Sequence, residues 1–198
     1  TLFPYTTLFR SVPGTIVPNG ARVPGTSHVL DPVTAAFNAG ALIRWLDFND
    51  AFYGRTVIHP SDNIGAILMT ADWLSRTRQA AGKAPLTMRD VLSAIIKAYE
   101  VQGGLALENG FTAAGLDHTI LVKIATTAAV SQLIGCTHDE VINALSNAWV
   151  DGRVTAGYQG APVKFNQQID ERSETAIACQ RIVGAALEVH PIFISAVL

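Results

Sequence analysis

Acidic and imidazole side chains gather in one short stretch of the chain, residues 43–63. Asp47 and Asp50 lie three apart where an apolar helix is expected to end, and His59 follows an aromatic loop. Imidazole titrates near neutral pH, so a histidine beside a carboxylate can accept a proton from one group and donate one to another. The stretch is therefore a candidate site for proton-transfer chemistry.

The same residues also fit simpler structures. The C-terminal end of a helix disfavours negative charge, so Asp47 can belong to a solvated acidic turn or to a salt bridge with Arg44 or Arg55. His59 precedes Pro60, which favours extended backbone at the histidine, and an ordinary loop histidine is the common case. Spacing alone leaves these alternatives open.

Three potential helix caps follow His59 in the sequence. Ser61, Asp62 and Asn63 can each accept a hydrogen bond from the free N–H groups at the start of a helix. A helix over residues 62–81 is predicted behind them, with an apolar side facing the core. The histidine is therefore expected at the junction between this helix and the preceding one.

A further candidate, His118, lies in the segment GLDHT, where another helix is expected to begin. The N-terminal end of a helix favours a neutral imidazole, and its N–H groups can hold a carboxylate. Lys123, one and a half turns later, can supply positive charge to an anionic substrate. The simpler interpretations are a first-turn polar residue for His118 and a solvated lysine at 123. The other histidines carry no informative motif: His28, His138 and His190.

Apolar periodicity and cap residues predict five helices joined by short loops. They are expected over residues 31–46, 62–81, 87–103, 116–134 and 137–152. The first opens at Asp31 and Pro32 and is apolar on every side, which indicates burial. Residues 12–30 read as a loop-rich segment with short extended pieces, and no strand pattern appears between the helices. The predicted fold class is an all-α helical bundle.

Two pairs of residues predict helix starts. Thr87 with Asp90 and Thr137 with Glu140 match the capping box, in which each side chain bonds the other's backbone N–H. The third helix is expected to stop near the paired glycines 103 and 104. Its apolar side is predicted from these residues: Val91, Leu92, Ile95, Ile96 and Tyr99.

Composition excludes several classes of function. Of 198 residues, 49% are apolar and 15% are charged, and the net charge of −2 offers no basic surface for nucleic acid. No apolar run reaches the roughly 18–20 uncharged residues of a membrane span, so no membrane association is expected. Cys136 and Cys179 show no metal-ligand spacing. A reduced, cytoplasmic protein is the plain interpretation.

The chain is predicted to have three segments. Residues 1–11, TLFPYTTLFRS, look like a translated sequencing-adapter primer and are interpreted as non-native, with a genuine N-terminal strand as the alternative. Residues 12–152 are assigned to the helical domain. Residues 153–198 are a divergent tail, expected to hold a loop and one helix over 172–189, and it is either native, frame-shifted or chimeric.

Several short motifs occur in one order between Val12 and Gly152. They are VPGTIVPNGARVPGT, LDPVTAAFNAGALIRWLDFND, HPSDN, ADWLSR, GKAPLTM, ALEN, GLDH and NAWVDG. This ordered set resembles the MmgE/PrpD family, and it is far more specific than any single short motif.

The resemblance implies a hydro-lyase that dehydrates 2-methylcitrate without an iron–sulfur cluster, other cofactor or metal. By position it implies Asp47, His59 and His118 as catalytic residues. Asp50 and Lys123 are the candidate substrate-binding residues, on their residue types and their places near the others. It also implies a small polycarboxylate substrate and an intact protein that is longer, with a second α/β domain and a homodimeric assembly. A related decarboxylase, an isomerase or epimerase, and a non-catalytic helical fragment are the alternatives.

Two departures from the family's pattern bear on activity. Ala51 stands where relatives are expected to carry a threonine hydroxyl. The lysine expected after Gly152 has no match at the right spacing, with Lys164 the nearest. The chain as given is therefore expected to be inactive by itself, because an open, hydrated site loses its electrostatic advantage.

Overall fold

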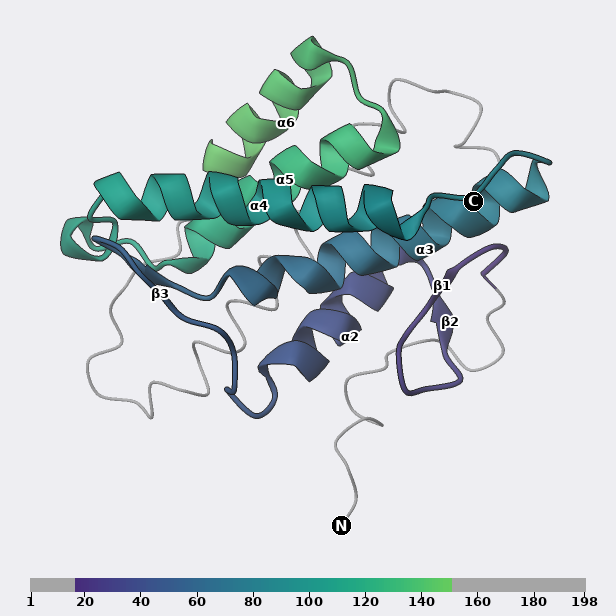
Figure 1. Cartoon of the computed structure of the whole chain (residues 1–198), viewed down its shortest axis with the longest axis horizontal. Coiled ribbons are helices and arrows are strands. Elements are labelled where there is room, and N and C mark those ends of the chain that lie inside the picture. The colour runs from purple at the N-terminus through teal and green to yellow at the C-terminus, as the bar shows by residue number, and fades with distance from the viewer. Residues whose placement is uncertain (1–16, 151–198) are drawn as a thin grey trace.

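The computed structural model describes residues 17–150, in which helices pack against one another and two short hairpins lie at the edge (Figure 1). The predictions for residues 1–11 and for the tail 153–198 lie outside the described residues. In chain order the elements are β1 (Ala21–Arg22), β2 (Val29–Leu30), α2 (Pro32–Arg44), β3 (Phe52–Tyr53), β4 (Val57–Ile58), η1 (Pro60–Asn63), α3 (Ile64–Ala80), α4 (Met88–Glu108), η2 (Thr112–Ala114), α5 (Thr119–Ile134) and α6 (His138–Val150).

The predicted all-α class is confirmed, with α2 packed on α3, and α5 packed on both α4 and α6. Each of the two small sheets contains one antiparallel pair, β1 with β2 and β3 with β4. The second pair corrects the expectation that no strand lies between the helices. Its two-residue strands are too short to give a periodic sequence signal. Within the described residues no helix is both long and apolar enough to cross a membrane.

Helix starts follow the predicted caps closely. The Asp31 side chain accepts hydrogen bonds from the first-turn backbone of α2. Thr87 and Asp90 form a capping box at α4, with Thr87 N donating to Asp90 Oδ2 over 2.7 Å. Thr137 and Glu140 bond in the same reciprocal way before α6. These contacts satisfy backbone N–H groups that have no carbonyl partner within their own helix.

Helix α4 differs from its prediction in length and in the face that it buries. It continues through glycines 103 and 104 to Glu108, because Gln102 and Ala106 are both fully buried and their packing offsets the low helix propensity of glycine. Leu92 and Ile96, expected in the core, are 53% and 60% exposed. The buried face of α4 consists instead of Val91, Ala94, Ala98, Gln102 and Ala106.

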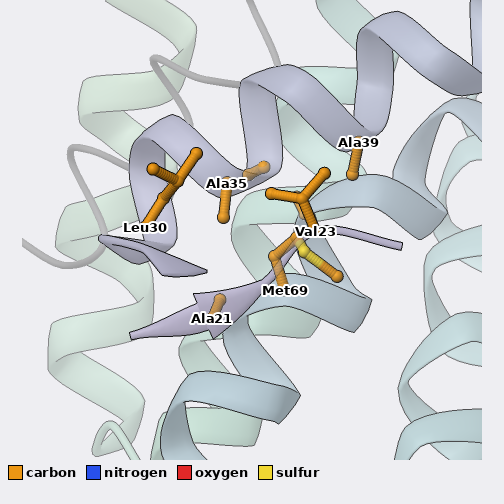
Figure 2. Close-up of a cluster of buried hydrophobic side chains, with 8 residues drawn as sticks. Ala21, Val23, Leu30, Ala35, Ala39 and Met69 are labelled. Carbon is orange, nitrogen blue, oxygen red and sulfur yellow. The ribbon is translucent and has the colours of Figure 1, made fainter. Parts of the chain in front are cut away.

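A core cluster joins the β1–β2 hairpin to α2 and α3. Figure 2 shows side chains from all three pointing toward one another, with Met69 of α3 and Val23 at their centre. Many of the residues are alanines, which lets the helix backbones come close together. At the closest point a Cβ on Gly65 of α3 would lie 2.8 Å from the backbone nitrogen of Gly40 in α2. No side chain fits between the two helices there.

An ion pair fixes the hairpin to α3. Arg22 donates to the Asp72 carboxylate from its backbone nitrogen, over 2.8 Å, and from its guanidinium. Burial alone would raise the pKa of Asp72, but the bonds from Arg22 outweigh it and hold that pKa below its usual value. A lowered carboxyl pKa stabilises the fold above the unfolded-state pKa, and this stabilisation is lost as the pH falls through the folded-state pKa.

We therefore expect Asp72→Asn to lower the free energy of unfolding at pH 7 and to have a smaller effect at about pH 3, where the wild-type carboxyl is protonated in the unfolded chain. Urea titrations of the full chain at both pH values measure this difference. Asp139→Asn is the matched control, because that side chain is 99% exposed. An equal loss of stability at both pH values would contradict a role for the charge.

Candidate active site

The loop between α2 and α3 folds back through the β3–β4 hairpin. Asp47 adopts a left-handed backbone conformation, with φ of 56°, which aspartate tolerates better than most residues other than glycine. In the hairpin Phe52 pairs with Ile58 and so reverses the direction of the chain. This reversal brings His59 against Asp50, as the junction predicted from sequence requires.

A buried arginine joins the two ends of this loop. Arg44 is 3% exposed, and its Nη2 lies 3.1 Å from Asp47 Oδ1. Its Nε lies 3.6 Å from Oδ1 of Asp62, which is also buried. The salt bridge from Asp47 to Arg44, one of the alternatives open in the sequence, is therefore present. A role of Asp47 in proton transfer stays a prediction.

The expected capping role of residues 61–63 is wrong. None of these side chains caps a helix, because the 3-10 turn η1 runs directly into α3 and supplies carbonyl partners. Ser61 accepts a hydrogen bond from Asn49 Nδ2 over 2.9 Å instead. Asp62 faces Arg44, and Asn63 points into the core. These polar side chains fix the loop to the bundle.

Asn63 is the centre of a buried polar network. Its Nδ2 donates to the carbonyl oxygen of Pro60 over 2.8 Å and also to Oε1 of Gln102 on α4. Its Oδ1 accepts from Thr126 Oγ1 on α5 over 2.7 Å. Asn63, Gln102 and Thr126 are fully buried. One side chain thus connects the end of the site loop to both neighbouring helices.

Asp50 and His59 form the first half of the site. His59 Nδ1 lies 2.7 Å from the carbonyl oxygen of Asp50. A carbonyl can only accept a hydrogen bond, so Nδ1 carries the hydrogen and the neutral ring keeps a lone pair on Nε2. The Asp50 carboxylate accepts from the backbone nitrogen of Ser61 over 3.0 Å. Burial and the nearby negative charges of Asp50 and Asp62 raise the pKa of Tyr99 to about 12. His59 is half-buried, so its Nε2 can act as a proton acceptor.

His118 supplies the second half from the start of α5. Its ring centroid lies 5.5 Å from that of His59, with the ring planes at 71°. His118 is 8% exposed, and its Nδ1 lies 3.1 Å from Oδ1 of Asp117. His118 lies at the start of α5, as expected, but as the residue immediately before Thr119 it stands just outside the helix and not just inside it. Residues far apart in sequence thus meet in one place.

Asp117 remains ionised beside His118. Burial would raise the pKa of the Asp117 carboxyl, but hydrogen bonds from His118 and Thr119 and the charge of His118 outweigh burial and lower that pKa. A carboxylate at Nδ1 orients an imidazole and stabilises its protonated form. The pair is therefore suited to hold a proton that His118 can later donate.

Lys123 occupies an unexpected environment. It is completely buried on α5, whereas the simpler sequence interpretation was a solvated side chain. Helix α5 is almost wholly enclosed by α3, α4 and α6. Hydropathy therefore varies little around this helix, and the sequence pattern could not indicate which way Lys123 faces. Direct contact with a substrate, the role expected for Lys123 from its charge and position, would require a movement that exposes it.

Sequence analysis missed two residues of the site. Tyr99 was assigned to the apolar side of its helix, although the charge of Asp50 acts on its hydroxyl and helps to raise its pKa. Asp117 directly precedes His118 in GLDHT, but the side chains of adjacent residues at a helix start need not point the same way, so their contact was not predicted. The described residues contain no group of three acidic, histidine or cysteine side chains placed to bind a metal ion.

A sequence model described as MmgE/PrpD N-terminal domain matches residues 3–189. The chain belongs to the MmgE/PrpD family. The match extends beyond residues 12–152, over which the motifs were recognised. Asp50, His59 and His118 therefore come together inside a domain of known family.

Several curated relatives in the MmgE/PrpD family are close in sequence. The 2-methylcitrate dehydratase of Salmonella typhimurium is 64% identical over 151 residues, which are 76% of this chain and 31% of that protein. The 2-methylcitrate dehydratases of Cupriavidus necator and Escherichia coli K12 are 63% and 62% identical over the same length and coverage. The chain thus spans about a third of the length of these relatives.

Proposed function

We propose that this chain supplies the acid–base groups of a hydro-lyase that dehydrates 2-methylcitrate to 2-methyl-cis-aconitate in the cytoplasm, as part of propionate catabolism. The observation that carries this proposal is the pairing of His59 and His118, whose ring centroids lie 5.5 Å apart. The names of relatives that are 62–64% identical support the choice of substrate.

His59 is the group suited to remove the proton. Dehydration breaks a C–H bond next to a carboxylate, and the electron pair forms the C=C bond as the C–O bond to the hydroxyl breaks. The Nδ1–H of His59 is held by the Asp50 carbonyl, so the lone pair on Nε2 is free to accept this proton. A neutral imidazole is a competent base near pH 7.

His118 is the group suited to protonate the leaving hydroxyl. The Asp117 carboxylate 3.1 Å from its Nδ1 favours the imidazolium form, which can donate from Nε2 and release water. The two histidines then have different environments, a carbonyl for one and a carboxylate for the other. Such a difference separates base from acid within one site.

A chimera tests the proposed function. The 151 aligned residues of this chain replace their counterpart in the Salmonella enzyme, because the chain spans only 31% of that relative. The assay follows the absorbance of the enoate product with 2-methylcitrate, citrate and cis-aconitate in turn. We expect turnover of 2-methylcitrate above that of the other two acids. A folded chimera without turnover would contradict the proposal.

We also infer that the protein forms a homodimer through an exposed stripe on α4. The stripe consists of Met88, Leu92, Ile96 and Leu107, which are 53–65% exposed and recur at helical spacing. The helix lies at the front of the view in Figure 1, where no other described element covers it.

A second copy fits this stripe by symmetry. In an antiparallel pairing of two α4 helices centred between Leu92 and Ile96, Leu92 of one copy faces Ile96 of the other. The same pairing places Arg89 of one copy near Glu100 of the other, so opposite charges meet beside the apolar contacts. The centre of the stripe is therefore self-complementary, with Leu92 against Ile96 and opposite charges beside them, whereas Leu107 lies beyond the paired part of α4.

Ile96→Glu should convert the dimer to a monomer, because two new carboxylates would be buried at the centre of the pairing. Light scattering during size-exclusion chromatography of the full chain measures the mass. Ile142→Glu is the control, since that isoleucine on α6 is 49% exposed and lies outside the stripe. A monomeric wild-type chain, or equal effects of both variants, would argue against this interface.

A further inference from the structure

Residues 59–63 form a short, well-braced turn that carries His59 at its first position. The carbonyl oxygen of His59 accepts a hydrogen bond from the backbone nitrogen of Asp62 over 3.0 Å. The ring of Pro60 restricts φ of that residue, and Asn63 Nδ2 holds the Pro60 carbonyl over 2.8 Å, so both backbone angles of Pro60 are fixed. The position of His59 is therefore tied to that of the Asn63 side chain.

The contacts around the Asn63 amide allow it one orientation. A carbonyl oxygen can only accept a hydrogen bond, so the atom of Asn63 that faces the Pro60 carbonyl must be the amide nitrogen. The same nitrogen donates to Oε1 of Gln102 on α4. The amide oxygen must then accept, and it takes the hydrogen of the Thr126 hydroxyl on α5 over 2.7 Å. The contact between the turn and α5 is therefore directional, with Thr126 as its donor.

Helix α5 extends this contact to His118. Thr126 lies about two helical turns after His118. The carbonyl oxygen of His118 accepts a hydrogen bond from the backbone nitrogen of Leu121 over 3.0 Å, so His118 is bonded to the first turn of the helix. Because hydrogen bonds also join the successive turns of an α-helix, His118 keeps a fixed position relative to Thr126.

Apolar packing also joins the two parts of the site, but it does not set their register. Ile58 and Ile120 belong to one buried cluster. Burial of apolar surface is non-directional, so it holds elements together without specifying how they are aligned. The next two buried hydroxyls along α5, those of Thr127 and Ser131, have no hydrogen-bond partner within the described residues. The Thr126 hydroxyl therefore supplies a directional restraint that these neighbours do not.

We propose that Thr126 is a positioning residue, whose hydrogen bond to Asn63 holds α5 in register with the turn and so sets the separation of the His59 and His118 imidazoles. Their ring centroids lie 5.5 Å apart. A base and an acid that act on one substrate need a fixed separation, and a misplacement of about 1 Å can lower the rate by about 10²-fold. The use of this separation in dehydration rests on the proposed function, whereas the separation itself does not.

Proton NMR of the full chain tests the separation without any need for turnover. A cross-peak between ring hydrogens requires that the rings lie close together, so we expect one between His59 and His118 in the wild type, and its loss in His59→Gln assigns it. Thr126→Val keeps the shape of the side chain and removes the donor. In that variant the cross-peak should weaken severalfold or disappear, whereas Thr126→Ser, which keeps the hydroxyl, should retain it.

Three outcomes of this experiment would overturn the proposal. The first is a wild-type spectrum without the cross-peak between the two rings. The second is a cross-peak of wild-type intensity in Thr126→Val. The third is a Thr126→Val chain that does not fold, because the hydroxyl would then support the fold as a whole and not the register of α5.

Thr127→Val is the matched control. Thr127 is the next residue on α5 and is 2% exposed, and its hydroxyl has no hydrogen-bond partner in the part of the chain that the structure describes. This substitution makes the same chemical change and should leave the cross-peak at wild-type intensity. Equal weakening in Thr127→Val and Thr126→Val would mean that a valine on α5 disturbs the packing generally, and the specific role of Thr126 would be wrong.

Kinetics of the chimera provide a second measurement. Thr126→Val should lower kcat for 2-methylcitrate by about tenfold to a hundredfold and change KM much less, because it misplaces the acid relative to the base. Thr126→Ser should restore kcat. A cross-peak that responds as expected, without turnover in the unmodified chimera, would contradict the proposed function and leave the positioning role intact. Normal turnover and an unchanged cross-peak in Thr126→Val would do the reverse.

Discussion

Replacing His59 by glutamine in the chimera should lower kcat for 2-methylcitrate by about 10²–10⁴-fold, the usual contribution of a general base. Glutamine keeps a donor for the Asp50 carbonyl, so the loop can stay closed while the basic nitrogen is lost. Because the effect falls on proton transfer, KM should change much less than kcat. Steady-state kinetics with 2-methylcitrate measure both constants.

His138→Gln provides the control for this experiment. That histidine lies at the start of α6, and its side chain is 86% exposed. It should retain the activity of the unmodified chimera. If the two substitutions reduce kcat equally, or if His59→Gln changes KM alone, then His59 binds the substrate or supports the fold and is not the base.

The largest expected effect on stability is that of Asn63→Ala. Truncation removes the side-chain partner of Gln102, of Thr126 and of the Pro60 carbonyl, all in the interior. A buried polar group without its partner costs about 1–3 kcal/mol, so the free energy of unfolding should fall by roughly 3–5 kcal/mol. A loss of that size is a large part of the stability of a typical domain.

Urea denaturation of the full chain measures this loss. Asn147→Ala is the matched control, because Asn147 is exposed on α6 and bonds only within its own helix. We expect its effect to stay within about 0.5 kcal/mol. Similar urea midpoints for the two variants would mean that water replaces the missing hydrogen bonds at Asn63 and that the polar network is accessible to solvent.

Features set by neighbouring residues could be predicted from sequence. The Asp31 cap and the Thr87–Asp90 box depend on backbone groups within three residues, so their spacing alone is sufficient. The same holds for Gly82 and Gly135, whose positive φ values of 71° and 89° end the preceding helices. The all-α class followed from these local signals.

Features set by packing could not be predicted in this way. Asn63 has the residue type and position of a cap, yet it bonds Gln102 and Thr126 because α4 and α5 happen to pass on either side of it. Helix propensity predicted that α4 would end at its paired glycines. The helix continues beyond them because Gln102 and Ala106 are buried in the core. Tertiary contacts override propensity when they bury enough surface.

The candidate site also combines features set by neighbouring residues with features set by packing. His59 and Asp50 were predicted to lie close together, because only a short loop separates them in sequence. The contact between His118 and His59 depends on how α5 packs against η1. Only the family resemblance, and not the apolar periodicity, indicated that His118 belongs to the same site. Tyr99 carried no signal beyond a polar group on a largely apolar helix. The roles of all five site residues remain predictions: Asp47, Asp50, His59, His118 and Lys123.

The contact between Gly40 and Gly65 has a consequence for how this domain can change over evolutionary time. At that point the spacing of α2 and α3 is set by two backbones, which have no rotamers and no volume to gain or lose. Substitutions elsewhere in the core can repack without altering this spacing. Since the two helices lead into and out of the loop that carries Asp50 and His59, substitutions elsewhere in the core should leave the geometry of the candidate site unchanged.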